Sequence, residues 1–210
     1  MIDPKYLQNL PPWAALLASR YATHTVSQFI LHGNVRDLSP MRQDGSVEFL
    51  NLKSFLTNSL FAGRDFVLQY DRANGLTYAN NETANDFAAF AKAYQTVTTP
   101  STSFAIQVPK DPLKLFPMID RYVRTRLAER KSLAVIIEYV DLIAPQGESG
   151  FLSEADRASL IYLRNWADDP VFLQADITFC LITEHLIQIN QDLVRSPYTV
   201  SVQISLPDLD

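Results

Sequence analysis

Cysteine and histidine are scarce in this sequence, which has one cysteine and three histidines among its 210 residues. The lone Cys180 has no partner for an internal disulfide, and so few cysteines and histidines exclude a Cys/His metal cluster. Cys180 falls within an apolar run and is expected to be a core residue. A chain without disulfides suits a reducing compartment, so we expect a cytoplasmic protein.

Long apolar runs and surplus positive charge are also missing. The longest apolar runs, such as residues 133–137, fall far short of the ~20 residues that cross a bilayer, and the sequence does not begin with a secretory signal. We therefore expect no membrane span. With 18 Lys and Arg against 23 Asp and Glu, the formal net charge is -5, which argues against a broad nucleic-acid-binding surface.

The sequence does contain the pattern of an α/β domain, and its 47% hydrophobic and 20% charged residues fit one globular core. Strands are predicted at residues 27–33, 65–70, 133–140, 177–183 and 198–205. Helices are predicted after Pro11 and Pro12 and at residues 49–61, 80–94, 116–130, 154–166 and 186–193. Residues 41–45 and 96–103 are predicted to be loops. The alternation predicts a three-layer α/β fold with a mostly parallel five-stranded sheet.

Polar residues follow the two most apolar strands, where ligands dock on open parallel sheets. Glu138 and Asp141 come after one strand, and Thr183, Glu184 and His185 come after the other. Carboxylates at a strand end can hold Mg²⁺ and orient water for nucleotide hydrolysis. The alternative is that these side chains simply meet solvent where the strands end.

The order of these elements resembles the second half of a AAA+ ATPase core, a P-loop NTPase fold. The similarity covers residues 133–210 well and the first half only by strand order. It implies that Glu138 and Asp141 stand where the family has its Walker B carboxylates and that Thr183 stands at the sensor position. It also implies that Arg195 stands where an arginine of the family reaches a neighbouring subunit.

The phosphate-binding motif of that family is missing. No segment matches G-x-x-x-x-G-K-[ST], the loop whose backbone N–H groups, lysine and hydroxyl hold phosphates and metal. The strand expected to lead into it, residues 66–70, runs into residues 71–77, which contain one glycine and no lysine. Asp71, Asn74, Gly75 and Thr77 are therefore only weak candidates for cofactor binding. We expect no hydrolysis, metal or cofactor in this domain.

As a whole, the chain resembles the degenerate N-terminal ATPase-like domain of bacterial tandem AAA+ proteins, with supporting segments at residues 31–38 and 66–72. The resemblance implies one AAA+ core-like domain over residues 1–210, without a lid and part of a longer chain. ATP and Mg²⁺ would then be used by a downstream domain, and the partners would be other AAA+ domains or subunits and protein clients. The implied function is non-catalytic: assembly, substrate engagement or regulation.

Two other hypotheses stay open. The chain could be an active NTPase with an atypical phosphate loop at residues 71–77, with Glu138 or Asp141 on the metal and Arg195 acting in trans. It could instead be a stand-alone protein that binds a ligand at the carboxyl edge of its sheet. His32 and His185 are expected to be structural, because no nucleophile accompanies them. Four arginines predict a solvated helix face or, alternatively, a subunit or phosphate contact: Arg121, Arg124, Arg126 and Arg130.

Overall fold

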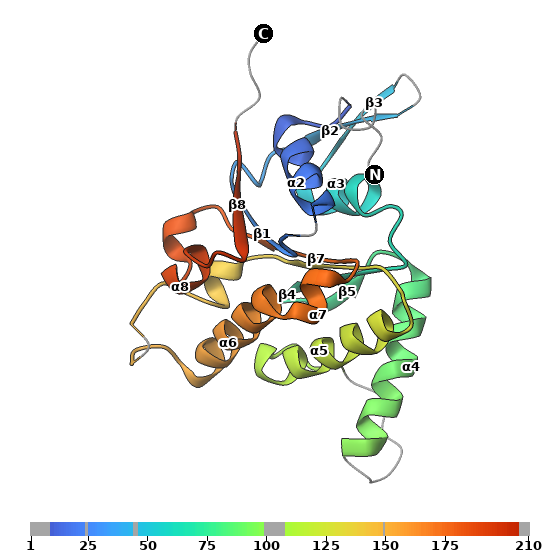
Figure 1. The fold of residues 1–210 in the computed structure, drawn as a ribbon, viewed down its shortest axis with the longest axis vertical. Coiled ribbons are helices and arrows are strands. Elements are labelled where there is room, and N and C mark those ends of the chain that lie inside the picture. Colours follow the sequence, from blue (N-terminus) through green and yellow to red (C-terminus); the bar gives the residue numbers. More distant parts are fainter. Residues whose placement is uncertain (1–8, 24, 44–45, 99–107, 149, 206–210) are drawn as a thin grey trace.

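The computed structural model describes residues 9–23, 25–43, 46–98, 108–148 and 150–205. Its main feature is a six-stranded sheet of order β5-β4-β6-β7-β1-β8 (Figure 1). All neighbouring strands in it run parallel except β4 and β5, so the predicted α/β fold with a mostly parallel sheet is confirmed. The strands are β1 (Gln28–Gly33), β4 (Phe66–Asp71), β5 (Gly75–Tyr78), β6 (Leu133–Ile137), β7 (Ile177–Ile182) and β8 (Thr199–Ile204).

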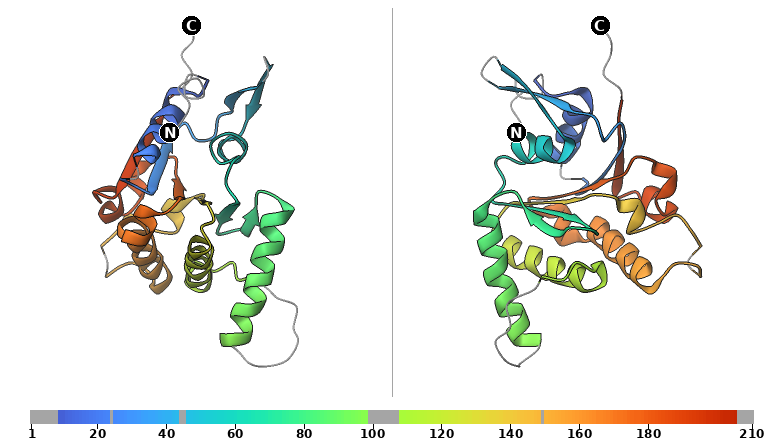
Figure 2. Two further views of the ribbon diagram at one scale, coloured as in Figure 1. Left: turned by 45° about the vertical axis from the view of Figure 1, so that its right-hand side comes forward. Right: turned by 180° about the vertical axis from the view of Figure 1, so that it is seen from behind.

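Helices cover both faces of the sheet. One layer holds α2 (Pro12–Ala22) and α3 (Leu52–Phe55), which continues into a π-helical turn, η1 (Leu56–Leu60). The other layer holds the larger helices, seen below the sheet in Figure 1 and again in both views of Figure 2. These are α4 (Asn81–Thr98), α5 (Pro112–Ala128), α6 (Glu154–Asp168) and α7 (Pro170–Gln174). The short elements η2 (Val140–Leu142), η3 (Leu186–Gln188) and α8 (Gln191–Val194) follow β6 and β7.

Side chains of the central strands alternate between two cores. Leu133, Val135 and Ile137 of β6 join the core beneath α5 and α6. Ala134 and Ile136 of the same strand join the core beneath α2 and α3. All five are fully buried, as expected for a parallel strand with a helical layer on each face. An almost continuous apolar run is therefore the sequence signature of this strand.

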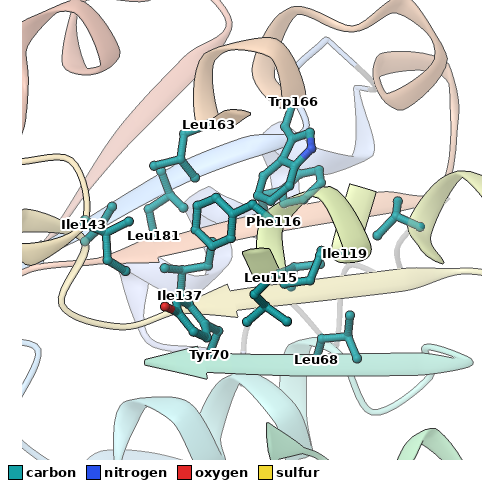
Figure 3. Close-up of a cluster of buried hydrophobic side chains, with 14 of the residues drawn as sticks. Leu68, Tyr70, Leu115, Phe116, Ile119, Ile137, Ile143, Leu163, Trp166 and Leu181 are labelled. Carbon is teal, nitrogen blue, oxygen red and sulfur yellow. The ribbon is translucent and has the colours of Figure 1, made fainter. Parts of the chain in front are cut away.

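An aromatic cluster holds α5 and α6 against the sheet. The ring of Trp166 stacks on Phe179 of β7 at a centroid distance of 5.0 Å and lies 5.1 Å from the ring of Phe116. Figure 3 shows Phe116 and Trp166 beside Leu163 and Leu181. The indole Nε1 donates a hydrogen bond of 3.0 Å to Asp120, so the buried ring leaves no polar atom unsatisfied.

Local signals in the sequence set where several helices begin. Asp111 caps α5 by accepting a hydrogen bond from the backbone N–H of Leu113, and Pro112 occupies the first helical position. Ser153 caps α6 in the same way by accepting from the N–H of Asp156. These caps satisfy backbone donors that the first helical turn leaves unpaired.

The predicted number of five strands is wrong for the main sheet, because β5 was not foreseen. No strand was predicted within residues 71–77. Gly75 has φ +81°, a conformation that glycine adopts without strain, and the chain returns as an antiparallel edge strand. Leu76 and Tyr78 of this strand pack against the core that contains α5 and α6.

The prediction of a loop at residues 41–45 is also wrong for residues 41–43, which the structure describes. Residues 41–43 belong to β2 (Ser39–Gln43), which pairs antiparallel with β3 (Ser46–Leu50) in a separate two-stranded ribbon. Phe49 lies in β3, opposite Pro40, rather than in the predicted helix, which begins at Leu52. Residues 44 and 45 lie outside the described part.

Three other boundaries differ from the prediction. The strand predicted at residues 133–140 ends at Ile137, because Tyr139 adopts a left-handed conformation with φ 55°. The helix predicted at residues 186–193 is divided into η3 and α8. The start of the loop predicted at residues 96–103 is wrong, because α4 continues to Thr98, and residues 99–107 lie outside the described part.

Truncating the central aromatic side chain should cost much of the domain's stability. We expect Trp166→Ala to lower the free energy of unfolding by about 3–5 kcal/mol, because it leaves a cavity between α5, α6 and β7. Ile161→Ala is the matched control on the same helix, because that side chain is 57% exposed. Its cost should stay below about 1 kcal/mol in urea unfolding. Equal costs for the two variants would contradict this account of the core.

Candidate functional site

The strand connections create one crevice at the carboxyl edge of the sheet. From β1 the chain crosses to β4, past β7 and β6, whereas from β7 it crosses over β1 to β8. The connections of these two neighbouring strands therefore leave in opposite directions, which makes the gap between them a topological switch point. Ligands of open α/β sheets bind at such points.

A cavity of about 570 Å³ lies at this switch point. Its walls come from the segments that follow β1, β6 and β7 and from the start of α3. Residues 66–70 were expected to lead into the phosphate loop, and this prediction is wrong. They form β4, which lies between β5 and β6 and away from the switch point, so β1 is the strand that leads into the cavity. Strand order in the sheet, which the sequence does not state, decides this assignment.

The structure brings Glu138, Asp141 and Thr183 together in the cavity. Glu138 forms an ion pair with Lys53, with 2.7 Å between Oε2 and Nζ. Asp141 accepts a hydrogen bond of 2.9 Å from the hydroxyl of Thr183. The left-handed Tyr139 turns the chain between the two carboxylates. Each carboxylate therefore faces the cavity with a partner from another segment.

A second ion pair, between Arg36 and Glu184, also lines the cavity. Arg36, which follows β1, places Nε 2.5 Å from Oε1 of Glu184. It also donates a hydrogen bond of 2.9 Å to the hydroxyl of Tyr139. The hydrogen bond from Arg36 lowers the pKa of Glu184 below its ordinary value. The ends of β1, β6 and β7 are thus joined by polar contacts.

Three backbone N–H groups at the end of β1 are hydrogen-bonded to carbonyl groups of the chain. Gly33 donates to the carbonyl of Glu184, Asn34 donates to the carbonyl of Ile204, and Val35 donates to the carbonyl of Gly33. Gly33 has φ +92°, and a Cβ there would lie 2.8 Å from the carbonyl oxygen of Ile204. This close approach requires glycine. Three amides at the end of β1 are therefore unavailable to an anion.

Sequence reasoning missed Lys53 and the helix start that carries it. Asn51 caps α3 by accepting from the N–H of Ser54, and Asn51, Leu52 and Lys53 line the cavity. Lys53-Ser54 is a lysine followed by a hydroxyl residue at the first turn of a helix, as in the end of the phosphate-binding motif. Only these two residues of the motif are present, and its glycines are absent, so the pattern is not found by a motif search.

The weak cofactor candidates lie outside the cavity, in the turn that joins β4 and β5 and in the adjoining strand residues. Asp71 accepts hydrogen bonds from the N–H groups of Ala73 and Asn74 and from the side-chain amide of Asn74. Burial acts to raise the pKa of Asp71, but these hydrogen bonds lower it overall. Gly75 and Thr77 belong to β5. The turn satisfies its own donors and presents no open row of amides.

The other candidate residues are scattered. Arg195 is exposed just after α8 and does not line the cavity. Cys180 is fully buried in β7, and burial raises the pKa of its thiol. His32 is half-buried in β1, and burial lowers its pKa, whereas His185 lies at the cavity wall.

Of the four arginines, Arg130 lies just beyond the end of α5 and the other three lie on it, and two of the four bind carboxylates within the domain. Arg124 contacts Asp120 and Asp169, and Arg126 contacts Asp86 and Glu129. Arg121 and Arg130 are exposed.

Two features are absent from the described residues. In that part of the chain, no group of three or more His, Cys, Asp or Glu side chains is placed to hold a metal ion. No described helix combines the length and the apolar character that crossing a membrane requires. The cytoplasmic location stays a prediction.

The sheet order and the switch-point cavity define a Rossmann-like α/β domain. A family model described as "AAA+ chaperone, N-terminal Rossmann-like domain" matches residues 3–205, so the chain belongs to that family. The predicted similarity to an N-terminal AAA+ domain is thereby confirmed.

One solved structure with a similar fold is described as "Structure of E. coli MS115-1 HORMA:CdnC:Trip13 complex". The match has a TM-score of 0.51 and 14% sequence identity, and it covers 91% of this chain and 52% of that chain. At this identity the likeness supports the fold alone. The present chain spans about half the length of that chain. No curated protein matches the sequence.

The ion pair between Lys53 and Glu138 should contribute measurably to stability. The two side chains are 32% and 21% exposed, so water screens them only in part. A double-mutant cycle with Lys53→Ala and Glu138→Ala should give a coupling of about 1 kcal/mol in urea unfolding. The exposed pair of Arg164 and Asp192 is the control, with an expected coupling below about 0.5 kcal/mol. A cavity pair coupled no more strongly than the control would contradict this expectation.

Proposed function

We propose that this domain is a degenerate, non-catalytic ATPase-like module that serves assembly, substrate engagement or regulation within a AAA+ machine. The observation that carries the proposal is the ion pair of Lys53 with Glu138. A lysine at this helix start is the natural ligand of a phosphate, and here an acid of the same domain occupies it. A nucleotide would have to displace that carboxylate before it gained the cation.

Charge and donors in the cavity support the same conclusion. Besides His185, the charged residues of its lining are two cations, Arg36 and Lys53, and three carboxylates. A triphosphate carries several negative charges and would meet no net positive charge there. The amides of Gly33, Asn34 and Val35 are bonded within the chain, so these three N–H groups do not cradle a phosphate as the backbone of a phosphate loop does.

The donor set does not fit a magnesium nucleotide either. Asp141 is hydrogen-bonded to Thr183, and Glu138 is paired with Lys53. Mg²⁺ bound with a nucleotide takes its remaining ligands from the phosphates. The two cations of this cavity that could bind those phosphates, Arg36 and Lys53, are paired with acids of the domain. We therefore propose that this domain needs no cofactor and that any ATP turnover belongs to a downstream domain of a longer, bacterial tandem protein.

Protein partners follow from this proposal. The similar solved structure is described as a complex of several proteins, and its chain is about twice as long as the part that this chain matches. We propose that other AAA+ domains or subunits and protein clients are the partners of this domain. In the parent protein, removal of residues 3–205 should then change the number of subunits in the assembly, which light scattering gives as the particle mass divided by the mass of the shortened chain.

A second candidate function rests on Lys53 and Ser54. They stand at the start of the helix that follows the switch-point strand, and Glu138 lies within ion-pair distance. If Lys53 turned toward a nucleotide, Glu138 would be free to contact a metal ion or water. This would be an NTPase with an atypical phosphate loop after β1, rather than at residues 71–77.

Calorimetry with ATP and Mg²⁺ separates the two functions. We expect no saturable binding to the unaltered domain and no phosphate release. Glu138→Gln removes the competing charge and frees Lys53, so saturable binding of ATP should become measurable in this variant. Glu148→Gln makes the same chemical change at an exposed position outside the cavity and should have no effect.

The opposite pattern would favour the enzyme. Saturable binding of ATP to the unaltered domain, together with phosphate release that Glu138→Gln abolishes, would contradict the non-catalytic proposal. Lys53→Ala should then remove binding, whereas under our proposal it changes nothing that involves nucleotide.

A further inference from the structure

A second cavity, of about 480 Å³, lies at the opposite edge of the sheet, where β4 and β7 begin. It is bounded by α2 and by residues 59–64, the segment that leads into β4. Leu17, Leu60 and Phe61 give it apolar walls. Its size falls within the range of small-molecule sites, about 300–1,000 Å³. None of the residues that line the switch-point cavity belongs to it.

A buried guanidinium forms one side of this cavity. The side chain of Arg64 is only 9% exposed, and its guanidinium lies 4.5 Å above the ring of Tyr21. Burial lowers the pKa of Arg64 to about 10, so the group remains a cation at neutral pH. Burying a cation is unfavourable unless its N–H groups are satisfied.

The hydrogen bonds of Arg64 leave part of the guanidinium unused. Nη1 donates to the backbone carbonyl and to the carboxylate of Asp176, and Nη2 donates to the hydroxyl of Thr178 at 3.3 Å. A guanidinium has five N–H donors. Within the described residues, Nε and one N–H of Nη2 therefore have no acceptor. Nε and Nη2 share one edge of the planar guanidinium, and such an edge can bind a carboxylate through two parallel hydrogen bonds.

Asp176 is the one carboxylate in the lining, and it lies at the mouth. Its side chain is 55% exposed, so it can turn into water without a large desolvation cost. Asp176 holds the guanidinium in the absence of another anion. An incoming carboxylate can either add to the unused edge of Arg64 or replace the side chain of Asp176.

We propose that this second cavity binds a carboxylate carried on a short apolar chain, with Arg64 pairing with the carboxylate and Leu17, Leu60 and Phe61 enclosing the chain. Phosphate fits less well, because the lining offers a single cation and few other donors. The carboxylate can come from a free acid or from the C-terminus of a polypeptide, and both share the same chemistry. The proposal does not depend on the function proposed for the switch-point cavity.

Matched probes test the charge requirement. Phenylbutyrate and its neutral amide, phenylbutyramide, have the same apolar part and nearly the same shape. In a ¹H–¹⁵N NMR titration, phenylbutyrate should bind about tenfold tighter or more, as expected for a charge-assisted pair. The Nε–H signal of Arg64 and the amide signals of Leu17 and Phe61 should shift. Absence of binding by phenylbutyrate, or equal affinities for acid and amide, would overturn the proposal.

Substitution of Asp176 distinguishes a ligand-binding Arg64 from an Arg64 that serves only the structure of the domain. Asp176→Ala removes the competing carboxylate and should raise the affinity for phenylbutyrate several-fold, while affinity for the amide stays unchanged. Asp168→Ala is the control for net charge, because Asp168 is exposed at the end of α6 and outside the cavity. Weaker binding of phenylbutyrate to the Asp176→Ala variant would contradict the competition that the geometry implies.

Arg64→Lys keeps the charge and removes the planar fork, so it should weaken phenylbutyrate binding by about tenfold. An unchanged affinity would count against the proposal. If this variant does not fold, the two probes and Asp176→Ala decide the question. An acetylated Ala-Ala-Leu peptide with a free C-terminus, compared with its C-terminal amide, then identifies the source. Tighter binding of this peptide than of phenylbutyrate indicates a polypeptide end, and the reverse order indicates a free acid.

Discussion

Strands β6 and β7 bury side chains on both faces, and this constraint organises the rest of the domain. A strand in this position needs a layer of helices above it and another below it. Parallel neighbours also require each connection to cross the sheet, which brings the ends of β1, β6 and β7 to one edge. The two cavities lie at the two edges of the sheet, where the strands end or begin and where the helical layers cannot cover polar backbone.

Both cavities contain cations, but the two cavities differ in how fully those cations are paired with acids of the domain. At the carboxyl edge, Lys53 and Arg36 are each paired with an acid that reaches into the same space. Polar groups that satisfy one another in this way stabilise the local structure and gain little from a ligand. At the other edge, Arg64 is more deeply buried, and its one acid partner, Asp176, faces water. An incoming anion would therefore gain more binding free energy from Arg64 than from Lys53 or Arg36.

The sequence predicted the elements whose side chains are buried in the core. It could not predict the strands that form because they pair with a neighbouring strand. The apolar runs of β6 and β7 and the spacing in α5 and α6 identify a three-layer α/β fold. By contrast, β5 exists because Gly75 turns the chain back, and β2 exists because it pairs with β3. Glu138, Asp141 and Thr183 were found because strand ends are local features. Lys53 was missed, because its approach to Glu138 depends on the order of strands in the sheet.

The separation between core and site explains how such a domain can keep its fold without a phosphate loop. The residues that enclose Trp166 and Phe179 are apolar and lie within the layers, whereas the cavity residues lie in the segments after the strands. Changes in these segments alter few buried contacts, so the architecture can persist while the chemistry at its edge changes. The ion pairs at the switch point also remove the free-energy cost of leaving these charges unpaired. Under the proposed function, an α/β domain of this kind therefore keeps its fold and its surfaces for protein partners without nucleotide chemistry.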